Sequence, residues 1–259
     1  MLKKINFHTH TKRCKHAIGE DEDYIKEAIE KGVLILGFSD HGPYADNRFS
    51  LRMNFNELSE YQDSLSKLKD KFKNKIEIKI GLEIEYFPTD DFYYNYLKNE
   101  LKFDYLALGQ HLFLDEEGNL KNTYSLKSTK DYISYAKSVE KGIKSGYFNF
   151  VAHPDLFFIN DIPWDKNCNL ACDIIIDTCK KYDFILEFNA NGLRRGKQKF
   201  KEGYRYPYPY KKFWEKVSKA HIKVIINSDC HNPKEVFDSN MKSSYIEAKK
   251  LNLNLIYNI

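Results

Sequence analysis

Short apolar strand patterns and amphipathic helix patterns alternate along the chain, and this alternation constrains the fold more than any other feature. The strand patterns cover residues 4–7, 34–38, 76–86, 105–108, 148–152, 184–188 and 223–227. The helix patterns cover residues 21–31, 56–72, 91–101, 129–145, 169–181, 210–220 and 243–251. Because these strand–helix units follow one another without a linker rich in proline, glycine or serine, we expect one α/β domain, residues 1–259, built as a parallel barrel or a doubly wound sheet.

Composition narrows the class of protein. The chain is 42% hydrophobic and 30% charged, as in soluble globular proteins, and no apolar run approaches the ~18 residues of a membrane span. Lys3 and Lys4 lead into a strand pattern and not into the apolar region of a signal peptide, so we expect a cytoplasmic protein without a membrane span. The net charge of +4 is compatible with a small anionic substrate and does not indicate nucleic acid.

The five cysteines are scattered and form no C-x-x-C pair. This spacing predicts reduced thiols and neither a disulfide framework nor a zinc site made of thiolates.

Three of the eight histidines, His8, His10 and His16, lie close together near the start of the chain. Ile5 and Phe7 fall on one face of the first strand pattern, which places His8 and His10 together on the other face. An isolated H-x-H pair is common by chance, so its meaning depends on the residues that join it.

Polar residues able to bind metals follow the other strand patterns at their C-terminal ends. The carboxyl ends of parallel strands share one face of such a fold, so we expect these side chains to converge there. They are His41, His111, His153, Asp229 and His231. The third strand pattern alternates branched apolar residues at even positions with polar residues or glycine at odd positions, so Glu83 and Glu85 should face the barrel axis. His221 precedes the seventh strand, at the opposite face, and is predicted to bind nothing.

A cluster of imidazoles and carboxylates drawn from several strands provides the ligands that divalent cations require, and a carboxylate can bridge two ions. The motifs also resemble those of the polymerase and histidinol phosphatase (PHP) family. The resemblance rests on H-x-H at 8–10, His16, S-D-H at 39–41, G-x-E at 81–83, the single histidines at 111 and 153, and D-x-H at 229–231. It implies a distorted seven-stranded, TIM-like (β/α) barrel with three divalent ions, Zn, Mn or Fe, at its C-terminal mouth.

The resemblance also implies a ligand set for each ion. The first ion is assigned to His8, His10, Glu83 and Asp229; the second to Glu83, His111 and His153; the third to His16, His41 and His231. Asp40 would orient a ligand or a water molecule.

Within the family, three passages look most like histidinol-phosphate phosphatases: residues 13–16, 51–53 and 187–196. Gly192-Leu193-Arg194 resembles the phosphate-contacting arginine of those enzymes, so Arg194 is the first candidate for substrate binding and Arg195 the second. A solvated basic loop is the alternative for this stretch. The tyrosine-rich segment 204–210 is expected either to line the mouth or to form an aromatic cap over the barrel rim.

The resemblance therefore implies a histidinol-phosphatase of histidine biosynthesis, a phosphoric monoester hydrolase that converts L-histidinol phosphate to L-histidinol and phosphate. We expect a hydroxide between two ions to attack phosphorus, with Asp229 and His231 as the catalytic candidates. Asp40, Glu85 and Asp155 are expected to face the cationic part of the substrate. The alternatives are a PHP phosphoesterase acting on nucleotides, nucleic-acid ends or another small phosphate ester, and a metal-binding module without catalytic activity.

Overall fold

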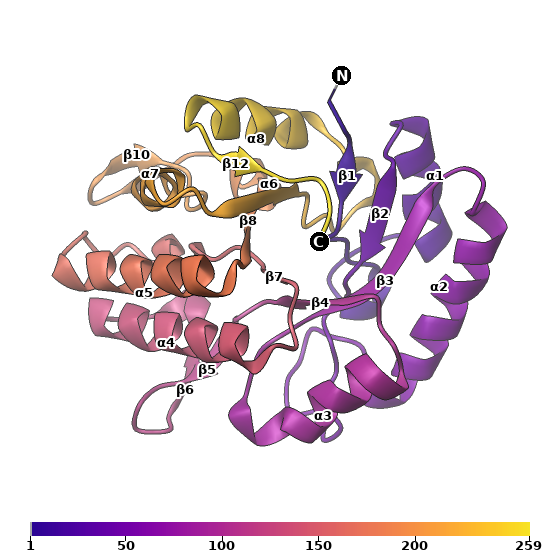
Figure 1. Ribbon diagram of the computed structural model, residues 1–259, viewed down its shortest axis with the longest axis horizontal. Coiled ribbons are helices and arrows are strands. Elements are labelled where there is room, and N and C mark those ends of the chain that lie inside the picture. Colours follow the sequence, from indigo (N-terminus) through magenta and orange to yellow (C-terminus); the bar gives the residue numbers. More distant parts are fainter. Residues whose placement is uncertain (1) are drawn as a thin grey trace.

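One curled sheet of eight parallel strands occupies the centre of the computed structural model, which describes residues 2–259 (Figure 1). The strands lie in the order β1-β2-β3-β4-β7-β8-β11-β12, and every neighbouring pair is parallel. Their bounds are β1 Ile5–Asn6, β2 Ile35–Phe38, β3 Glu77–Ile84, β4 Tyr105–Leu108, β7 Phe150–Val151, β8 Ile185–Asn189, β11 Lys223–Asn227 and β12 Asn254–Leu255.

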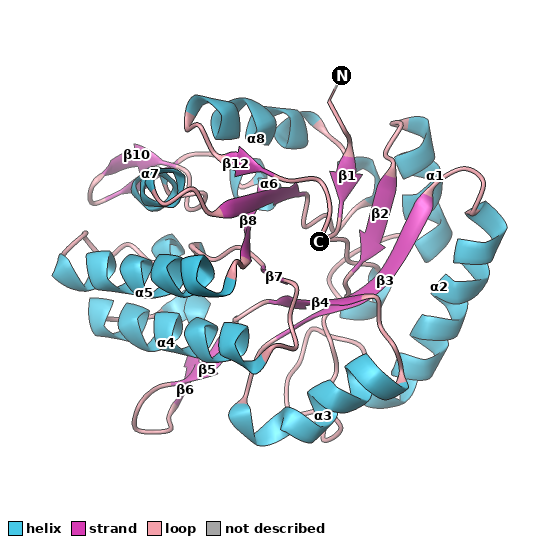
Figure 2. Cartoon of the chain, in the orientation of Figure 1, coloured by secondary structure: helices cyan, strands magenta, loops and turns pink. Residues whose placement is uncertain are grey.

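The helices cover the outer surface of this sheet (Figure 2). They are α1 Asp21–Glu30, α2 Leu58–Phe72, α3 Asp91–Asn95, α4 Thr129–Ser145, α5 Lys166–Tyr182, α6 Ala190–Arg194, α7 Lys211–Lys219 and α8 Ser239–Lys250. Strands inside and helices outside confirm the predicted α/β class and its distorted, TIM-like barrel form. Within residues 2–259, no helix is both long enough and apolar enough to cross a membrane.

The chain that follows β1 pairs with the chain that follows β11 at the mouth of the barrel. A parallel bridge joins Thr9 to Cys230, and the backbone N–H of His10 donates to the carbonyl of Cys230 at 3.0 Å. At the other end of the same β11 edge, β12 pairs with Lys223 and Val224. The sequence analysis did not expect this eighth strand, because two paired residues are too few to leave a periodic pattern.

Apolar residues form two cores, one on each face of the sheet. The inner core fills the barrel with Ile5, Phe7, Tyr105, Ala107, Phe150, Ala152 and Ile225. The outer core packs under the helices and includes Ile78, Ile80, Leu82 and Ile84, the even positions of β3. The predicted alternation is therefore confirmed, since the odd positions face the barrel axis and both Glu83 and Glu85 are buried there.

Local signals explain why most helix bounds fall close to the predicted ones. Ser128 caps α4 in a reciprocal capping box with Asp131, and Gly146 ends the helix with φ 75°. Asp165 accepts hydrogen bonds from the N–H groups of Asn167 and Cys168, which starts α5 three residues before the predicted helix. The predicted helix at 91–101 divides into α3 and a π-helical turn, Tyr96–Glu100.

Two hairpins extend the loops that follow β4 and β8. The first pairs β5 (Leu112–Leu114) with β6 (Leu120–Asn122), and the second pairs β9 (Gln198–Phe200) with β10 (Gly203–Arg205). Both were missed because three-residue strands leave no readable alternation. All five cysteines are buried and unpaired, which agrees with the predicted reduced thiols.

Tyr105 braces the inside of the barrel. Its ring lies against Gly37 and Gly81, where a Cβ atom on either glycine would collide with it. Its hydroxyl lies 2.7 Å from the carbonyl oxygen of Phe7 and 2.9 Å from that of Phe38. One buried hydroxyl therefore ties β4 to the chain that follows β1 and to β2.

Replacing Tyr105 with phenylalanine should lower the free energy of unfolding by about 1–2 kcal/mol, because a buried hydrogen-bond donor is lost while the ring remains. Denaturant unfolding measures the change. Tyr135→Phe is the matched control, since the Tyr135 hydroxyl is buried without a hydrogen-bond partner and its removal should cost nothing. Equal destabilisation of the two variants would contradict the bracing role of Tyr105.

Candidate metal centre

The carboxylate of Glu83 lies at the centre of the barrel mouth, and five histidine rings surround it. Its two oxygens divide these rings into two sets. Oε2 lies 3.3 Å from Nε2 of His8, 3.4 Å from Nε2 of His10 and 3.0 Å from Nδ1 of His41. Oε1 lies 2.7 Å from Nε2 of His153 and 3.5 Å from Nε2 of His111. Such a division is the geometry that a carboxylate bridging two cations needs.

Asp229 follows β11 and approaches the same histidines from the other side. Its Oδ1 lies 3.2 Å from Nε2 of His10, 3.6 Å from Nε2 of His8 and 3.6 Å from Nδ1 of His231. Its Oδ2 accepts hydrogen bonds from the side-chain amides of Asn189 at 3.2 Å and Asn191 at 3.1 Å. The two amides therefore orient the carboxylate so that Oδ1 faces the imidazoles.

His16 and His231 face each other through their Nε2 atoms, which are 2.9 Å apart. Nδ1 of His16 lies 2.7 Å from the carbonyl of Cys14, and Nδ1 of His231 lies 3.2 Å from the carbonyl of Asp229. Because a carbonyl only accepts, each Nδ1 carries the proton and each Nε2 presents a lone pair. Two facing lone pairs repel unless a proton or a cation lies between them.

His41 lies close to His10 as well as to His16. Its ring centroid is 4.4 Å from that of His10 and 5.3 Å from that of His16. His10, His41 and His231 can present three nitrogens to one ion, and Cys14, His16 and His231 form another such group. The structure therefore brings all nine predicted ligands to one mouth, with His41 between two of the groups.

The donor atoms are suited to divalent cations. The buried atoms without a hydrogen-bond partner include Nε2 of His8, both ring nitrogens of His10, Oε2 of Glu83 and Nδ1 of His153. Burial alone would raise the pKa of Glu83 and of Asp229, but the surrounding histidines hold both pKa values well below the ordinary range. Burial lowers the pKa of His41 to about 4. Ionised carboxylates beside unpaired imidazole nitrogens form a donor set that fits Zn, Mn or Fe.

Backbone turns at the strand ends aim these side chains. His153 has φ 30° and Asp229 has φ 50°, both in the left-handed region that side-chain-bearing residues rarely adopt. The first strand, β1, ends at Asn6, and beyond it successive side chains no longer alternate between the two faces of the sheet. Phe7 packs in the inner core, and the next residue, His8, still reaches the mouth of the barrel. His8 and His10 do lie together, with ring centroids 4.9 Å apart, as predicted.

Glu187 on β8 is a buried residue of this centre that the sequence analysis did not identify. Its Oε1 lies 2.8 Å from Nδ1 of His8 and accepts from the amide of Asn227 at 2.9 Å. Its Oε2 accepts from the backbone N–H of His153 and from the amide of Asn189, each at 2.8 Å. Glu187 thus fixes the ring of His8 and leaves Nε2 to face Glu83 and Asp229. The alternation that assigned Glu83 inward applies equally to Glu187 and could have found it.

The three carboxylates expected to face a cationic substrate are engaged elsewhere. Glu85 pairs with the buried Arg52, with two contacts of 3.0 Å. Asp40 accepts from the N–H and the hydroxyl of Thr11, each at 2.8 Å, and burial raises its pKa to about 7.

Asp155 accepts from the N–H of Tyr210 at 2.6 Å and from the indole N–H of Trp214 at 2.9 Å. All three carboxylates are fully buried, so the expectation that they contact substrate was wrong. Asp40 instead orients the loop that carries His10 and His16.

A cavity of about 260 Å³ opens above the histidines. Its lining residues are His16, His41, His111, Tyr124, Asn191, Arg195, Asp229, His231 and Glu235. Tyr124, from the 3₁₀ turn after β6, lies parallel to the ring of His111 at 6.1 Å. His8, His10, His153 and Glu83 are buried beneath this layer.

The two arginine candidates occupy different places. Arg195 is exposed and lines the cavity, and its Nε donates to the hydroxyl of Tyr208 at 3.1 Å. Arg194 is not among the lining residues: its guanidinium donates to Asp238 at 3.1 Å and to the carbonyl and hydroxyl oxygens of Ser228 at 3.2 and 3.1 Å. Arg195 therefore lies where a ligand in the cavity could reach it, whereas Arg194, the first candidate from the sequence, is bonded to protein groups.

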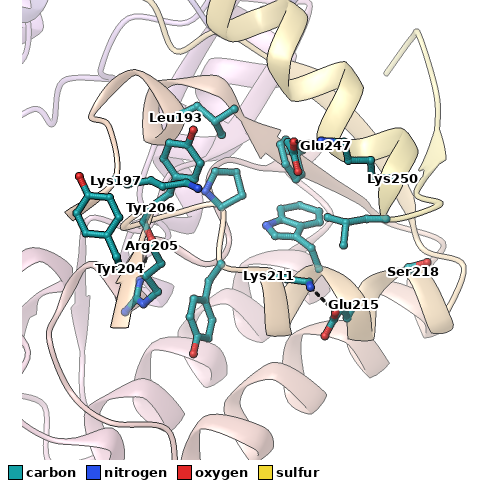
Figure 3. Close-up of a pocket in the computed structure, with 15 residues that line it drawn as sticks. Leu193, Lys197, Tyr204, Arg205, Tyr206, Lys211, Glu215, Ser218, Glu247 and Lys250 are labelled. Atoms are coloured by element: carbon teal, nitrogen blue, oxygen red, sulfur yellow. Dashed lines mark hydrogen bonds and ion pairs between the residues drawn. The ribbon is translucent and has the colours of Figure 1, made fainter. Parts of the chain in front are cut away.

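The tyrosine-rich segment 204–210 does not line the mouth where the histidines meet. Tyr208 is buried under Arg195, while Tyr206 and Tyr210 line a second, larger cavity of about 570 Å³ beside α7 and α8 (Figure 3). The nine predicted ligands do not line this second cavity. His221 is exposed at the start of β11, at the opposite end of the strand from Asp229.

The sequence pattern that defines the family described as "PHP domain" matches residues 6–191. A probable histidinol-phosphatase of Deinococcus radiodurans is 25% identical over 88% of this chain and 86% of its own length. The histidinol-phosphatase of Bacillus subtilis is 23% identical over 75% of this chain and 83% of its own length.

Among solved structures, histidinol phosphate phosphatase from Lactococcus lactis, complexed with zinc, L-histidinol and phosphate, has a TM-score of 0.73. It is 18% identical, and the match covers 99% of this chain and 96% of that one. At this identity the likeness establishes the fold.

Replacing Glu187 with glutamine should lower the affinity for zinc or manganese about 10- to 100-fold, because an amide nitrogen would face hydrogen-bond donors and release the ring of His8. Competition with a chromophoric chelator measures the affinity. Glu77→Gln, at the exposed start of β3, is the control with the same change of charge. The positioning role is excluded if the two variants bind the metal equally.

Replacing Arg52 with methionine should lower the free energy of unfolding by about 3–5 kcal/mol at neutral pH, because Glu85 would remain buried without its partner. Although burial opposes ionisation, Arg52 and His111 lower the pKa of Glu85 from 4.5 to about 2. A depressed folded-state pKa gives stability that is fully present above pH 4.5 and is lost as pH falls toward 2.

The difference between wild type and Arg52→Met should therefore shrink across that range in denaturant titrations. The double variant Arg52→Met/Glu85→Gln should recover part of the loss. A pH-independent difference would show that Arg52 acts through packing alone.

Proposed function

Because the chain belongs to the PHP domain family, a family of metal-dependent phosphoesterases, we propose that it is a histidinol-phosphatase that hydrolyses L-histidinol phosphate to L-histidinol and phosphate. The observation that carries the proposal is the carboxylate of Glu83, whose oxygens divide five histidines into two sets. The printed names of the Deinococcus radiodurans and Bacillus subtilis relatives support the choice of substrate, as do the ligands of the Lactococcus lactis structure.

Three cation sites are part of the proposal. His8, His10, Glu83 and Asp229 would hold the first; Glu83, His111 and His153 the second; and His16, His231 and His41 the third. When bound, the cations polarise the phosphoryl oxygens and bring the pKa of water toward neutrality. Phosphate-ester hydrolysis needs such help, since a single general acid or base supplies only ~10²- to 10⁴-fold acceleration.

The protein groups bind the ester and handle its protons. Arg195 would pair with the phosphoryl oxygens, and its hydrogen bond to Tyr208 and its place in the cavity lining support this role. Asp229 and His231 remain the catalytic candidates because both line the cavity. Burial alone would raise the pKa of Asp229, but His8, His10 and His231 hold it well below its ordinary value, so the carboxylate stays ionised and can serve as a ligand.

The rival substrates are nucleotides, nucleic-acid ends and other small phosphate esters. No lysine lines the cavity, and Arg195 is its one arginine among the residues that the structure describes. A polyanionic substrate would require a more extended basic surface. The geometry thus favours a small monoester.

The deciding experiment is phosphate release from an ester panel by protein that has been stripped with a chelator and then reloaded with zinc, manganese or iron. Histidinol phosphate should give the highest kcat/KM, and stripping should abolish the activity. Faster turnover of a nucleotide than of histidinol phosphate would favour the rival assignment, a phosphoesterase acting on nucleotides. No turnover of any ester after reloading would refute it.

Replacing Arg195 with methionine should lower kcat/KM about 100-fold, because a charged donor to the phosphoryl group is lost. Replacing Arg194 with methionine should instead lower the free energy of unfolding by about 1–3 kcal/mol, because the half-buried contacts to Asp238 and Ser228 are lost. Steady-state kinetics and thermal unfolding of both variants separate the two roles. An Arg194 variant with the larger kinetic loss would restore the sequence-based order.

A further inference from the structure

Among the residues that the structure describes, two carboxylates line the cavity of about 260 Å³ above the histidines. They belong to Asp229 and Glu235. Both oxygens of Asp229 are committed, one to the imidazoles and the other to Asn189 and Asn191. Glu235 is therefore the carboxylate with capacity to meet a substrate.

Glu235 ends the 3₁₀ turn Pro233–Glu235, and one of its oxygens accepts no hydrogen bond from the residues that the structure describes. Oε2 accepts from the backbone N–H of His231 at 3.1 Å. Oε1 has no hydrogen bond within residues 2–259. It forms an ion pair of 3.7 Å with Nε of Arg194, which donates its hydrogen bond to Asp238 at 3.1 Å. The side chain is 29% exposed, so it is neither sealed in the core nor fully hydrated.

The backbone at Glu235 is fixed. Its carbonyl accepts from the hydroxyl of Ser228 at 2.6 Å, and its N–H donates to the carbonyl of Asn232 at 2.9 Å. A carboxylate on a fixed turn loses little conformational freedom when it binds a cation.

The cavity therefore presents opposite charges from different elements. Arg195 follows α6, and Glu235 follows β11 through the loop that carries His231. An anion–cation pair of this kind matches a ligand with a phosphate at one end and an ammonium group at the other.

We propose that Glu235 binds the ammonium group of the substrate and makes the enzyme select phosphate monoesters that carry a positive charge near the phosphate. This inference rests on the proposed phosphatase activity and adds the residue that sets its specificity. It also replaces Asp40, Glu85 and Asp155, whose side chains are buried and do not line the histidine cavity.

The test compares matched esters with and without the amino group: histidinol phosphate against its deamino analogue, and 2-aminoethyl phosphate against ethyl phosphate. The wild-type enzyme should give a kcat/KM at least tenfold higher for each amino ester, mainly through KM. Glu235→Gln should reduce this ratio about tenfold, the effect expected for one charge-assisted hydrogen bond. Glutamine keeps an oxygen that can accept from the N–H of His231, so the loop should remain in place.

Glu247→Gln is the matched control, since Glu247 lies at the rim of the second cavity (Figure 3) and should leave the ratio at the wild-type value. Calorimetric binding of 2-aminoethylphosphonate and ethylphosphonate to metal-loaded protein gives the same comparison without turnover. Glu235→Gln should remove the preference for the amino compound.

Each outcome decides one question. Equal wild-type kcat/KM for the amino and deamino esters would overturn the role of Glu235 and leave the phosphatase proposal standing. Equal losses on both esters in Glu235→Gln would show that Glu235 only supports His231 and would also overturn it. Turnover of no ester by the wild type would refute the proposed function, whereas the phosphonate preference would still test the ammonium site.

Discussion

The structure depends on keeping one ionised carboxylate, that of Glu83, in a site sealed from water. An isolated carboxylate in such a place would take up a proton, because burial penalises the charged form. Five histidines and the chain turns that aim them offset this penalty, and they come from the ends of four different strands, β1, β2, β4 and β7. The barrel mouth is thus organised around a negative charge that needs positive partners. A metal cation could bind the carboxylate of Glu83 and the unpaired imidazole nitrogens at the same time.

Much of the fold could be predicted because its signals are local. The alternation of β3 separates the outer core from the barrel axis, and this pattern alone placed Glu83 and Glu85 inside. The capping box of Ser128 and Asp131 likewise fixed the start of α4. The β5–β6 and β9–β10 hairpins and β12 were missed because their pairing partners, and not their own residues, define them.

The site was predictable in its residue types but less so in its contacts. Ligand-type residues could be assigned because parallel strand ends share one face, which needs only the order of elements. The roles of Arg194 and Arg195 could not be separated, because neighbouring side chains on a short helical turn diverge and only the partners Asp238 and Tyr208 distinguish them. Glu85 and Asp155 were misjudged for a similar reason, since Arg52 and Trp214 lie far from them in the sequence.

The bridge between Thr9 and Cys230 has a consequence for how the protein matures. It joins the segment that holds His8 and His10 to the segment that holds Asp229 and His231, and these two segments lie far apart in the sequence. A ribosome must therefore release the segment around Cys230 before His8 and His10 can meet Asp229 and His231. A product terminated before that segment would lack two of the nine candidate ligands, Asp229 and His231, together with the bridge that fixes the loop of His10.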